Sequence, residues 1–228
     1  MSLVQTNETA VDLARLKLRL AGISLGLREA RLLRGAIATG QVRSEFHNHR
    51  DDTLVYRHPL VRYDTSFGVP RIVGIGAGAM LTKTLQLPAT IKLGQQQVEI
   101  LDSSIESERV VIGPSKEPIQ YLLGSPLLPL NQKNDRIWRK GNKDDRQNLL
   151  DRVLIGNVLS FCKTVGLHVS EKIVVKTNLA PAGAFVLKPG VRMRGFRGSF
   201  EINFHLPEFW GLGKSSSRGF GTIVRKRG

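Results

Sequence analysis

The sequence contains a single cysteine, Cys162, among 228 residues. One cysteine excludes an internal disulfide and any zinc cluster built on several thiolates, so Cys162 is expected to be a small core residue. The chain also lacks an apolar run near the roughly 20 residues needed to cross a bilayer, and its first residues show no cleavable signal pattern. We therefore expect a cytoplasmic protein without a membrane partner.

Acidic residues are scarce, because 19 Asp and Glu stand against 34 Lys and Arg and leave a net charge of +15. Such an excess favours association with polyanions through counterion release, which makes nucleic acid the first candidate partner. A membrane-surface protein would gather its charge on one helix or tail, whereas here the charge is spread along the chain. With 41% apolar residues, the chain is expected to fold into one large or two small cores.

A strand with a basic face is predicted near the start of the chain. Residues 13–23 alternate, with leucines on one face and Arg15, Lys17 and Arg19 on the other. Five further elements follow from periodicity and turn residues: a helix over 28–40, two strands around the turn at 66–68, a helix over 78–85, and a strand near 96–102 or 108–113. This order, β-α-β-β-α-β, extends to about residue 115.

The second half is also predicted to be a sheet covered by helix, which makes the fold class α+β. Its longest helix is predicted over 146–166, where apolar residues form one stripe before Gly166. A polar loop is predicted over 132–146, where one half could move against the other. The predicted strands cover 119–131, 171–177, 184–189, 196–206 and 222–227.

Two glycine-rich stretches suggest different ligands. GIGAGA at 74–79 fits a loose dinucleotide-binding pattern, but the strand before it reads as the second arm of a hairpin. Close packing of helix on strand explains those glycines, and no cofactor is expected. GLGKSSSRGFG at 211–221 combines backbone freedom with hydrogen-bond donors and no acid, which suits a phosphate backbone; a flexible hairpin loop remains the alternative. Its candidate RNA-binding residues are Gly211, Gly213, Lys214, Ser215, Ser216, Ser217, Arg218, Gly219 and Gly221.

His47 and His49 lie in the stretch FHNHR at 46–50. The letters HNH are a coincidence with the name of a metal-dependent nuclease motif, whose positions are scattered. A zinc site would need more ligands than the adjacent Asp51 and Asp52 can easily provide, so no metal is expected. Two alternatives remain at this point: exposed loop histidines or a proton-transfer pair.

Several motifs together resemble the CRISPR repeat-processing endoribonucleases of the repeat-associated mysterious protein superfamily. They are RGA at 34–36, FHNH at 46–49, YRHPLVRY at 56–63, SPLLPLNQKN at 125–134 and SFEINFHLPEFWGLGKSSSRGFG at 199–221. The resemblance extends over nearly the whole chain. It implies two tandem ferredoxin-like (βαββαβ, RRM-like) domains, which we expect at 1–115 and 116–228, the first with the catalytic histidines and the second with the glycine-rich loop.

The resemblance also implies an activity: cleavage of CRISPR precursor RNA within each repeat, without a metal ion, to leave a 2′,3′-cyclic phosphate and a 5′-hydroxyl. The catalytic histidine of the family follows the first helix, which in this sequence indicates His47 or His49. Two imidazoles suit this reaction, since one can remove the 2′-hydroxyl proton while the other protonates the leaving oxygen. In an extended segment, positions two apart face the same side.

Supporting roles are less defined by the motifs. Some relatives use a tyrosine on the preceding helix, which the stretch 28–40 lacks, so Arg50, Tyr56 and Lys214 are the candidates. Arg15, Lys17 and Arg19 are expected to contact RNA. A non-catalytic RNA-binding subunit of a CRISPR effector complex is the alternative function. Other subunits of such a complex and a homodimer are open as further partners.

Overall fold

The computed structural model describes residues 8–38, 49–50, 53–54 and 58–227, with the backbone alone for Arg28 and for residues 49–50 and 53–54. Its helices are α1 (Leu27–Ala38), α2 (Ala77–Lys83), α3 (Gln132–Lys140) and α4 (Lys143–Thr164). Its strands are β1 (Thr9–Leu20), β2 (His49–Arg50), β3 (Thr53–Leu54), β4 (Val61–Asp64), β5 (Arg71–Ile75), β6 (Thr90–Leu93), β7 (Gln96–Leu123), β8 (Val175–Lys188), β9 (Val191–His205) and β10 (Ile223–Arg225).

The first half is a ferredoxin-like domain. Its sheet runs in the order β4-β5-β1-β7, and each neighbouring pair is antiparallel. With α1 after β1 and α2 after β5, this is the predicted β-α-β-β-α-β arrangement, with β6 added beside β7. Leu16, Leu18 and Leu20 are buried, as the alternation of β1 predicts.

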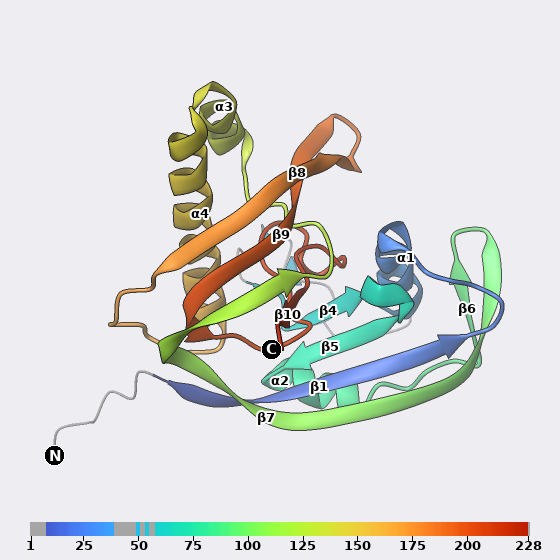
Figure 1. Cartoon of the computed structure of the whole chain (residues 1–228). Coiled ribbons are helices and arrows are strands. Elements are labelled where there is room, and N and C mark those ends of the chain that lie inside the picture. The colour runs from blue at the N-terminus through green and yellow to red at the C-terminus, as the bar shows by residue number, and fades with distance from the viewer. Residues whose placement is uncertain (1–7, 39–48, 51–52, 55–57, 228) are drawn as a thin grey trace, which may run out of the picture.

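The second half repeats this arrangement with one replacement. Its strands follow the order β10-β7-β9-β8, and α4 packs on β8. The second helix of a ferredoxin-like domain would lie between the third and fourth strands, and here residues 206–222 cross that interval without a helix. The glycine-rich loop, residues 211–221, belongs to this crossing segment (Figure 1).

One strand belongs to both sheets. β7 pairs with β1 through its first part and with β9 and β10 through its last part, with a register shift between Pro114 and Ile119. The predicted domain boundary at residues 115 and 116 falls at this shift. The two halves also share one hydrophobic cluster, which contains Leu13 and Val73 of the first half and Phe161 and Trp210 of the second. The halves are therefore held against each other by apolar packing as well as by the strand.

The predicted polar loop over 132–146 is wrong, because these residues form α3 and the first turn of α4. Asn131 accepts the backbone N–H of Asn134, and Asn142 and Asp145 form a reciprocal capping box. Polar residues at helix starts were thus mistaken for loop residues. The two candidate strands at 96–102 and 108–113 are parts of the single strand β7.

Cys162 is buried on α4, as expected, and burial raises its pKa to about 11. In the described part of the chain, no helix is long and apolar enough to span a membrane.

Candidate RNA-binding and catalytic site

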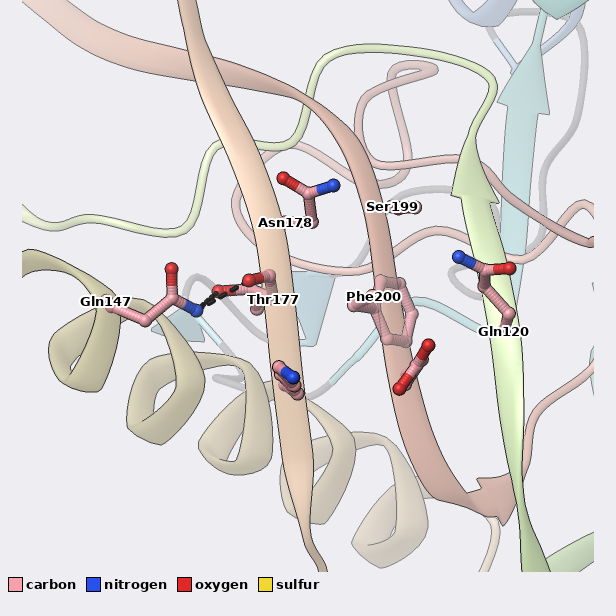
Figure 2. Close-up of a pocket in the computed structure, with 8 residues that line it drawn as sticks. Gln120, Gln147, Thr177, Asn178, Ser199 and Phe200 are labelled. Atoms are coloured by element: carbon pink, nitrogen blue, oxygen red, sulfur yellow. Dashed lines mark hydrogen bonds between the residues drawn. The ribbon is translucent and has the colours of Figure 1, made fainter.

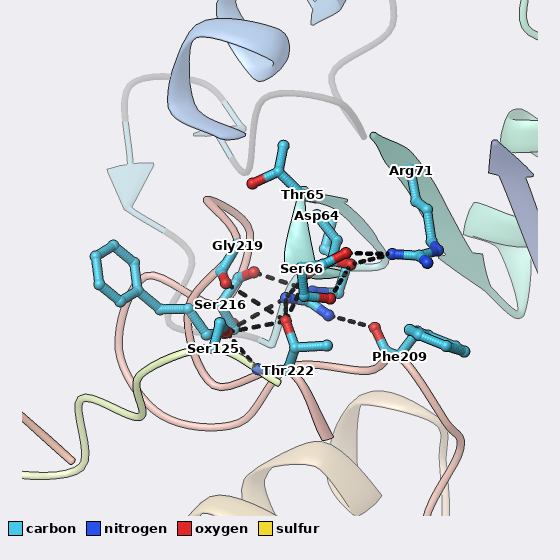
Figure 3. A network of polar contacts seen from close by, with 12 residues as sticks. Asp64, Thr65, Ser66, Arg71, Ser125, Phe209, Ser216, Gly219 and Thr222 are labelled. Atoms are coloured by element: carbon cyan, nitrogen blue, oxygen red, sulfur yellow. Dashed lines mark hydrogen bonds and ion pairs between the residues drawn. The ribbon is translucent and has the colours of Figure 1, made fainter. Parts of the chain in front are cut away.

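The glycine-rich loop is docked on the first domain. Tyr63 of β4 forms a parallel bridge with Arg218, and its N–H donates to the carbonyl of Ser217 at 3.2 Å. Figure 3 shows Ser216 and Gly219 of the loop beside Asp64 of β4, within one network of polar contacts. Although Arg62 of β4 and Ser216 of the loop are 154 positions apart in the sequence, the loop and β4 form one local structure.

Arg62 makes the most extensive of these contacts. Its side chain is fully buried and donates to the carbonyl oxygens of Phe209 and Ser216 and to the Thr222 hydroxyl, the last two at 3.1 and 2.8 Å. A guanidinium removed from water needs acceptors for its N–H groups, and residues in and directly beside the loop provide them. The shape of the loop therefore depends on a side chain of the other domain.

Asp64 balances the buried positive charge. One of its carboxylate oxygens lies 3.1 Å from Arg71 Nη1, and the other accepts the Thr222 hydroxyl at 2.6 Å. The Thr222 N–H in turn donates to the Ser125 hydroxyl at 2.9 Å. The network thus joins β4 and β5 to the residue that follows the glycine-rich loop (Figure 3).

The loop glycines permit this docking. A Cβ at Gly211 would lie 2.8 Å from Arg62 Nε, and one at Gly219 would lie 2.6 Å from Ala30 Cβ of α1. Both distances are shorter than side chains tolerate, so glycine is required where the loop meets the first domain. Gly213 and Gly221 also adopt positive φ angles, of 78° and 65°.

The polar residues of the loop divide by exposure. Lys214 is exposed and Ser216 is buried, while Ser215, Ser217 and Arg218 are half-buried. Burial, followed by repulsion from the Arg218 guanidinium, lowers the pKa of Arg34 on α1. The two like charges are therefore close enough to repel each other, and a phosphate between them would relieve that repulsion.

The predicted catalytic residues lie at the border of the described structure. His47 and Tyr56 lie outside the described residues, whereas His49 and Arg50 belong to β2, which pairs with β3 and of which only the backbone is described. The segment that carries these residues follows α1 and ends before His58. The helix before this segment contacts the glycine-rich loop near its own start, at Ala30 beside Gly219, and His58 after the segment contacts the loop at Gly211.

His58 is part of the scaffold. Its Nε2 lies 2.7 Å from the Gly211 carbonyl oxygen, and because a carbonyl only accepts, Nε2 carries the proton. The ring centroid lies 5.6 Å from that of Phe161 and 5.8 Å from that of Trp210. Burial is the main cause that lowers the pKa of His58 to about 4. The ring is thus neutral near pH 7 and suited to hold the loop.

This lowered pKa predicts an acid-dependent loss of stability. Below about pH 6.5 the unfolded chain protonates His58 while the folded protein does not, so the free energy of unfolding falls as pH decreases toward 4, by about 3 kcal/mol in total from this residue. His58→Gln keeps a donor for Gly211 but does not titrate. The free energy of unfolding of both proteins is measured by urea unfolding between pH 4 and 7. As the pH decreases, we expect that of the wild type to fall more steeply than that of His58→Gln, by about 1.4 kcal/mol per pH unit. Parallel curves for the two proteins would contradict this.

The basic face of β1 is partly neutralised. Arg15 pairs with Glu108 and Lys17 with Glu106, both on β7, and a second oxygen of Glu106 lies 3.6 Å from Arg15 Nε. Arg19 is exposed, and its exposure keeps it accessible to a ligand. Two of the three predicted RNA-binding residues on this strand therefore already have acidic neighbours, which sequence alternation alone could not reveal.

The stretch at 74–79 is a packing feature. β5 is antiparallel to both of its neighbours, so it is not the first strand of a parallel dinucleotide-binding unit. A Cβ at Gly74 would lie 2.0 Å from the carbonyl oxygen of Gly78, and one at Gly78 would lie 2.1 Å from that of Leu60. Close approach of α2 to the sheet accounts for both glycines.

A hollow on the second domain does not coincide with the predicted site. Figure 2 shows it over β7, β8 and β9, with Gln147 of α4 at its border. Gln147 donates to the Thr177 hydroxyl at 2.7 Å, and the charges of Lys176 and Glu201 oppose each other. Such a balanced lining does not favour a polyanion. Within the residues whose side chains are described, no group of three or more His, Cys, Asp or Glu could hold a metal ion.

The sequence interpretation missed the residues that position the loop: Arg62, Asp64 and Arg71. In β4 and β5, alternation marks such residues as solvent-facing, and only the docking of a distant loop buries them. It also did not predict that Arg34 lies close enough to Arg218 for their charges to interact, although the stretch RGA at 34–36 contributes to the resemblance. The sequence offered one indication that β4 belongs to the site, which was the stretch YRHPLVRY at 56–63 among the motifs of the resemblance.

Comparisons with known proteins show which family the chain resembles in sequence and fold. The Cas6b N-terminal domain family model matches residues 11–110, and the Cas6b C-terminal domain model matches residues 113–226. The uncharacterized protein MJ0978 of Methanocaldococcus jannaschii is 36% identical over 114 residues, which are 50% of this chain and 76% of that protein.

Solved structures are similar over almost the whole chain. One described as the crystal structure of Cas6b has 31% identity and a TM-score of 0.88, covering 96% of this chain and 100% of its own. A second, described as the CRISPR RNA processing endoribonuclease Cas6b, has 28% identity and a TM-score of 0.74, with the same coverage. These matches confirm the resemblance and the tandem ferredoxin-like fold. This chain belongs to the Cas6b family.

Proposed function

We propose that this chain is an endoribonuclease that cuts CRISPR precursor RNA within its repeats without a metal ion. The ribose 2′-hydroxyl attacks the adjacent phosphorus, and the products carry a 2′,3′-cyclic phosphate and a 5′-hydroxyl. Membership of the Cas6b family supports the activity, since a solved relative is described as a CRISPR RNA processing endoribonuclease. The net charge of +15 supports a nucleic-acid substrate.

One observation carries the proposal: the glycine-rich loop contacts the chain on both sides of the segment with His47 and His49. Gly219 packs on Ala30 of α1, two helical turns before that helix ends, and Gly211 accepts the hydrogen bond of His58. The histidine segment therefore follows a helix whose first turns contact the loop, and it precedes His58, which contacts the loop directly. An RNA backbone on the loop would lie within reach of this segment.

His47 and His49 act as the acid–base pair in this proposal. One imidazole accepts the proton of the 2′-hydroxyl as the new P–O bond forms, and the other donates a proton to the 5′-oxygen as the old bond breaks. An imidazole with a pKa near ~6.5 serves in both protonation states at neutral pH. No electron donor or additional reactant is needed, because the substrate contains its own nucleophile.

Cations stabilise the negative charge of the pentacoordinate phosphorus. Arg218 and Arg34 are suited to this role, because burial and mutual repulsion make a shared phosphate favourable. Lys214 is exposed on the loop and is proposed to contact the backbone, with Arg50 and Tyr56 as supporting residues of the histidine segment. The RNA backbone is also proposed to contact the backbone N–H groups and serine hydroxyls of the loop, and Arg19 on β1. For Arg15 and Lys17, RNA contact would require phosphates to compete with Glu106 and Glu108.

Cleavage in a chelator tests the proposal. The protein is incubated with a cognate repeat RNA in EDTA, and the ends of the fragments are identified. We expect cleavage at one position, a 3′ fragment that polynucleotide kinase labels directly, and a 5′ fragment that ends in a cyclic phosphate. A requirement for Mg²⁺, or a 5′ fragment that ends in a 3′-hydroxyl at the cut, would contradict the mechanism. Tight binding without cleavage would instead favour a non-catalytic RNA-binding subunit.

A further inference from the structure

Phe67 presents an aromatic ring to solvent on the turn between β4 and β5. It exposes 64% of its surface and is the only aromatic among the strongly exposed large apolar residues in the part of the chain that the structure describes. Its φ angle is 59°, in the left-handed region that bulky residues rarely adopt. The exposure of the Phe67 ring and its backbone conformation both lower the stability of the folded protein. A residue that breaks two local rules without a packing gain is expected to serve function.

The turn that carries Phe67 is rigidly attached. Ser66 is buried, and its hydroxyl donates to Asp64 Oδ2 at 2.7 Å. Arg71 Nη1 donates to the carbonyl oxygens of Ser66 and Val69, at 2.9 and 3.1 Å, and these two residues lie on either side of Phe67 in the turn. The network that positions the glycine-rich loop therefore also fixes the backbone beneath the exposed ring.

The ring lies beside the end of the glycine-rich loop. A Cβ added at Gly124 would lie 2.8 Å from Phe67 Cε2, so the edge of the ring rests directly on the Gly124 backbone. The Gly124 N–H donates to the carbonyl of Thr222 at 2.9 Å, one residue after the loop. One edge of the ring is thus supported by protein, while most of its surface remains open next to the proposed path of the RNA backbone.

An unpaired nucleobase fits this ring. A base presents a flat π-face, and stacking on an aromatic side chain is tolerant of sequence, as in proteins that bind single-stranded nucleic acid. A rigid ring loses little conformational freedom on stacking, which favours such a contact over one made by a flexible side chain. We propose that Phe67 stacks with an unpaired base of the RNA whose backbone lies on the glycine-rich loop. This inference rests on the proposed function, because it names a contact of the same substrate.

Binding of a non-cleavable repeat RNA tests the inference. The RNA carries a 2′-deoxy nucleotide at the cut, and its affinity is measured for the wild type, Phe67→Tyr, Phe67→Leu and Phe67→Gly. We expect Tyr to bind within about twofold of the wild type, and Leu and Gly to bind about tenfold more weakly. Glycine accepts the positive φ angle, so its thermal unfolding midpoint should not fall.

A scan of abasic positions separates stacking from a structural effect. One abasic position should weaken binding to the wild type about tenfold but to Phe67→Gly less than twofold, because the contact is already absent. Unchanged affinity of Phe67→Gly and Phe67→Leu would overturn the inference and leave an apolar protein partner as the occupant of the ring. If the wild type itself neither binds nor cuts repeat RNA, the proposed function fails. The wild-type measurement alone shows this, whatever the Phe67 variants do.

Discussion

His47→Ala and His49→Ala are each expected to slow the cleavage of repeat RNA by about 100-fold to 10,000-fold. Each variant removes one of the two proton transfers, while the loop that binds the RNA backbone is unchanged. The RNA affinity should therefore stay within about threefold of the wild type. The measurement is the single-turnover rate with enzyme in excess, together with the affinity for an RNA that carries a 2′-deoxy nucleotide at the cut.

Histidines outside this segment provide the matched controls. His168 is exposed and His205 ends β9, and alanine at either position should leave the rate within about threefold of the wild type. A large loss in the controls would mean that the rate reports general damage. Wild-type rates in both His47→Ala and His49→Ala would remove the acid–base pair from the account, and a loss at only one position would refute the assignment of two histidines.

Arg62→Ala is expected to lower the free energy of unfolding by about 3 to 5 kcal/mol, a range typical of a buried ion pair that loses one partner. The substitution leaves Asp64 buried beside Arg71 alone, removes the side-chain donor of the Phe209 carbonyl, and removes one of the two donors of the Ser216 carbonyl. Since these carbonyls belong to the segment that carries the glycine-rich loop, cleavage should fall as well. Urea unfolding and single-turnover cleavage measure the two effects.

Two further variants make the Arg62 prediction decisive. Arg152→Ala removes an exposed arginine from α4, and we expect a stability change within about 0.5 kcal/mol. Thr222→Val removes only the hydroxyl that accepts from Arg62 and donates to Asp64, so we expect the free energy of unfolding to fall by about 1 to 3 kcal/mol. This milder variant still tests the network if Arg62→Ala does not fold. Stability of Arg62→Ala within about 1 kcal/mol of the wild type would show that the network does not hold the loop.

Local patterns predicted much of the fold. The alternation of β1 and the apolar stripe of α4 are set by near neighbours in sequence, because a sheet face and a helix face repeat over two and about 3.6 residues. Leu150, Leu154, Val158 and Phe161 are buried as the stripe predicts. The βαββαβ order of the first half follows from such elements in succession.

The polar contacts between distant segments could not be predicted in this way. Arg62 donates to Thr222, which lies 160 positions later, and Lys17 pairs with Glu106, which lies 89 positions later. Periodicity treats all four side chains as surface residues, and only the docked structure decides which ones are buried or neutralised. For the site, the motifs indicated the loop and the histidines, whereas the network that joins the loop to the first domain required the fold.

The most direct test of the central claim changes one atom of the substrate. A repeat RNA whose nucleotide before the cut lacks its 2′-oxygen is incubated with the wild-type protein in EDTA, beside the unmodified RNA. The account predicts equal binding of the two RNAs, cleavage of the unmodified RNA, and none of the deoxy RNA, because the nucleophile is missing. Cleavage of the deoxy RNA at the same bond would contradict the account, since a water molecule or another group would then have to attack the phosphorus.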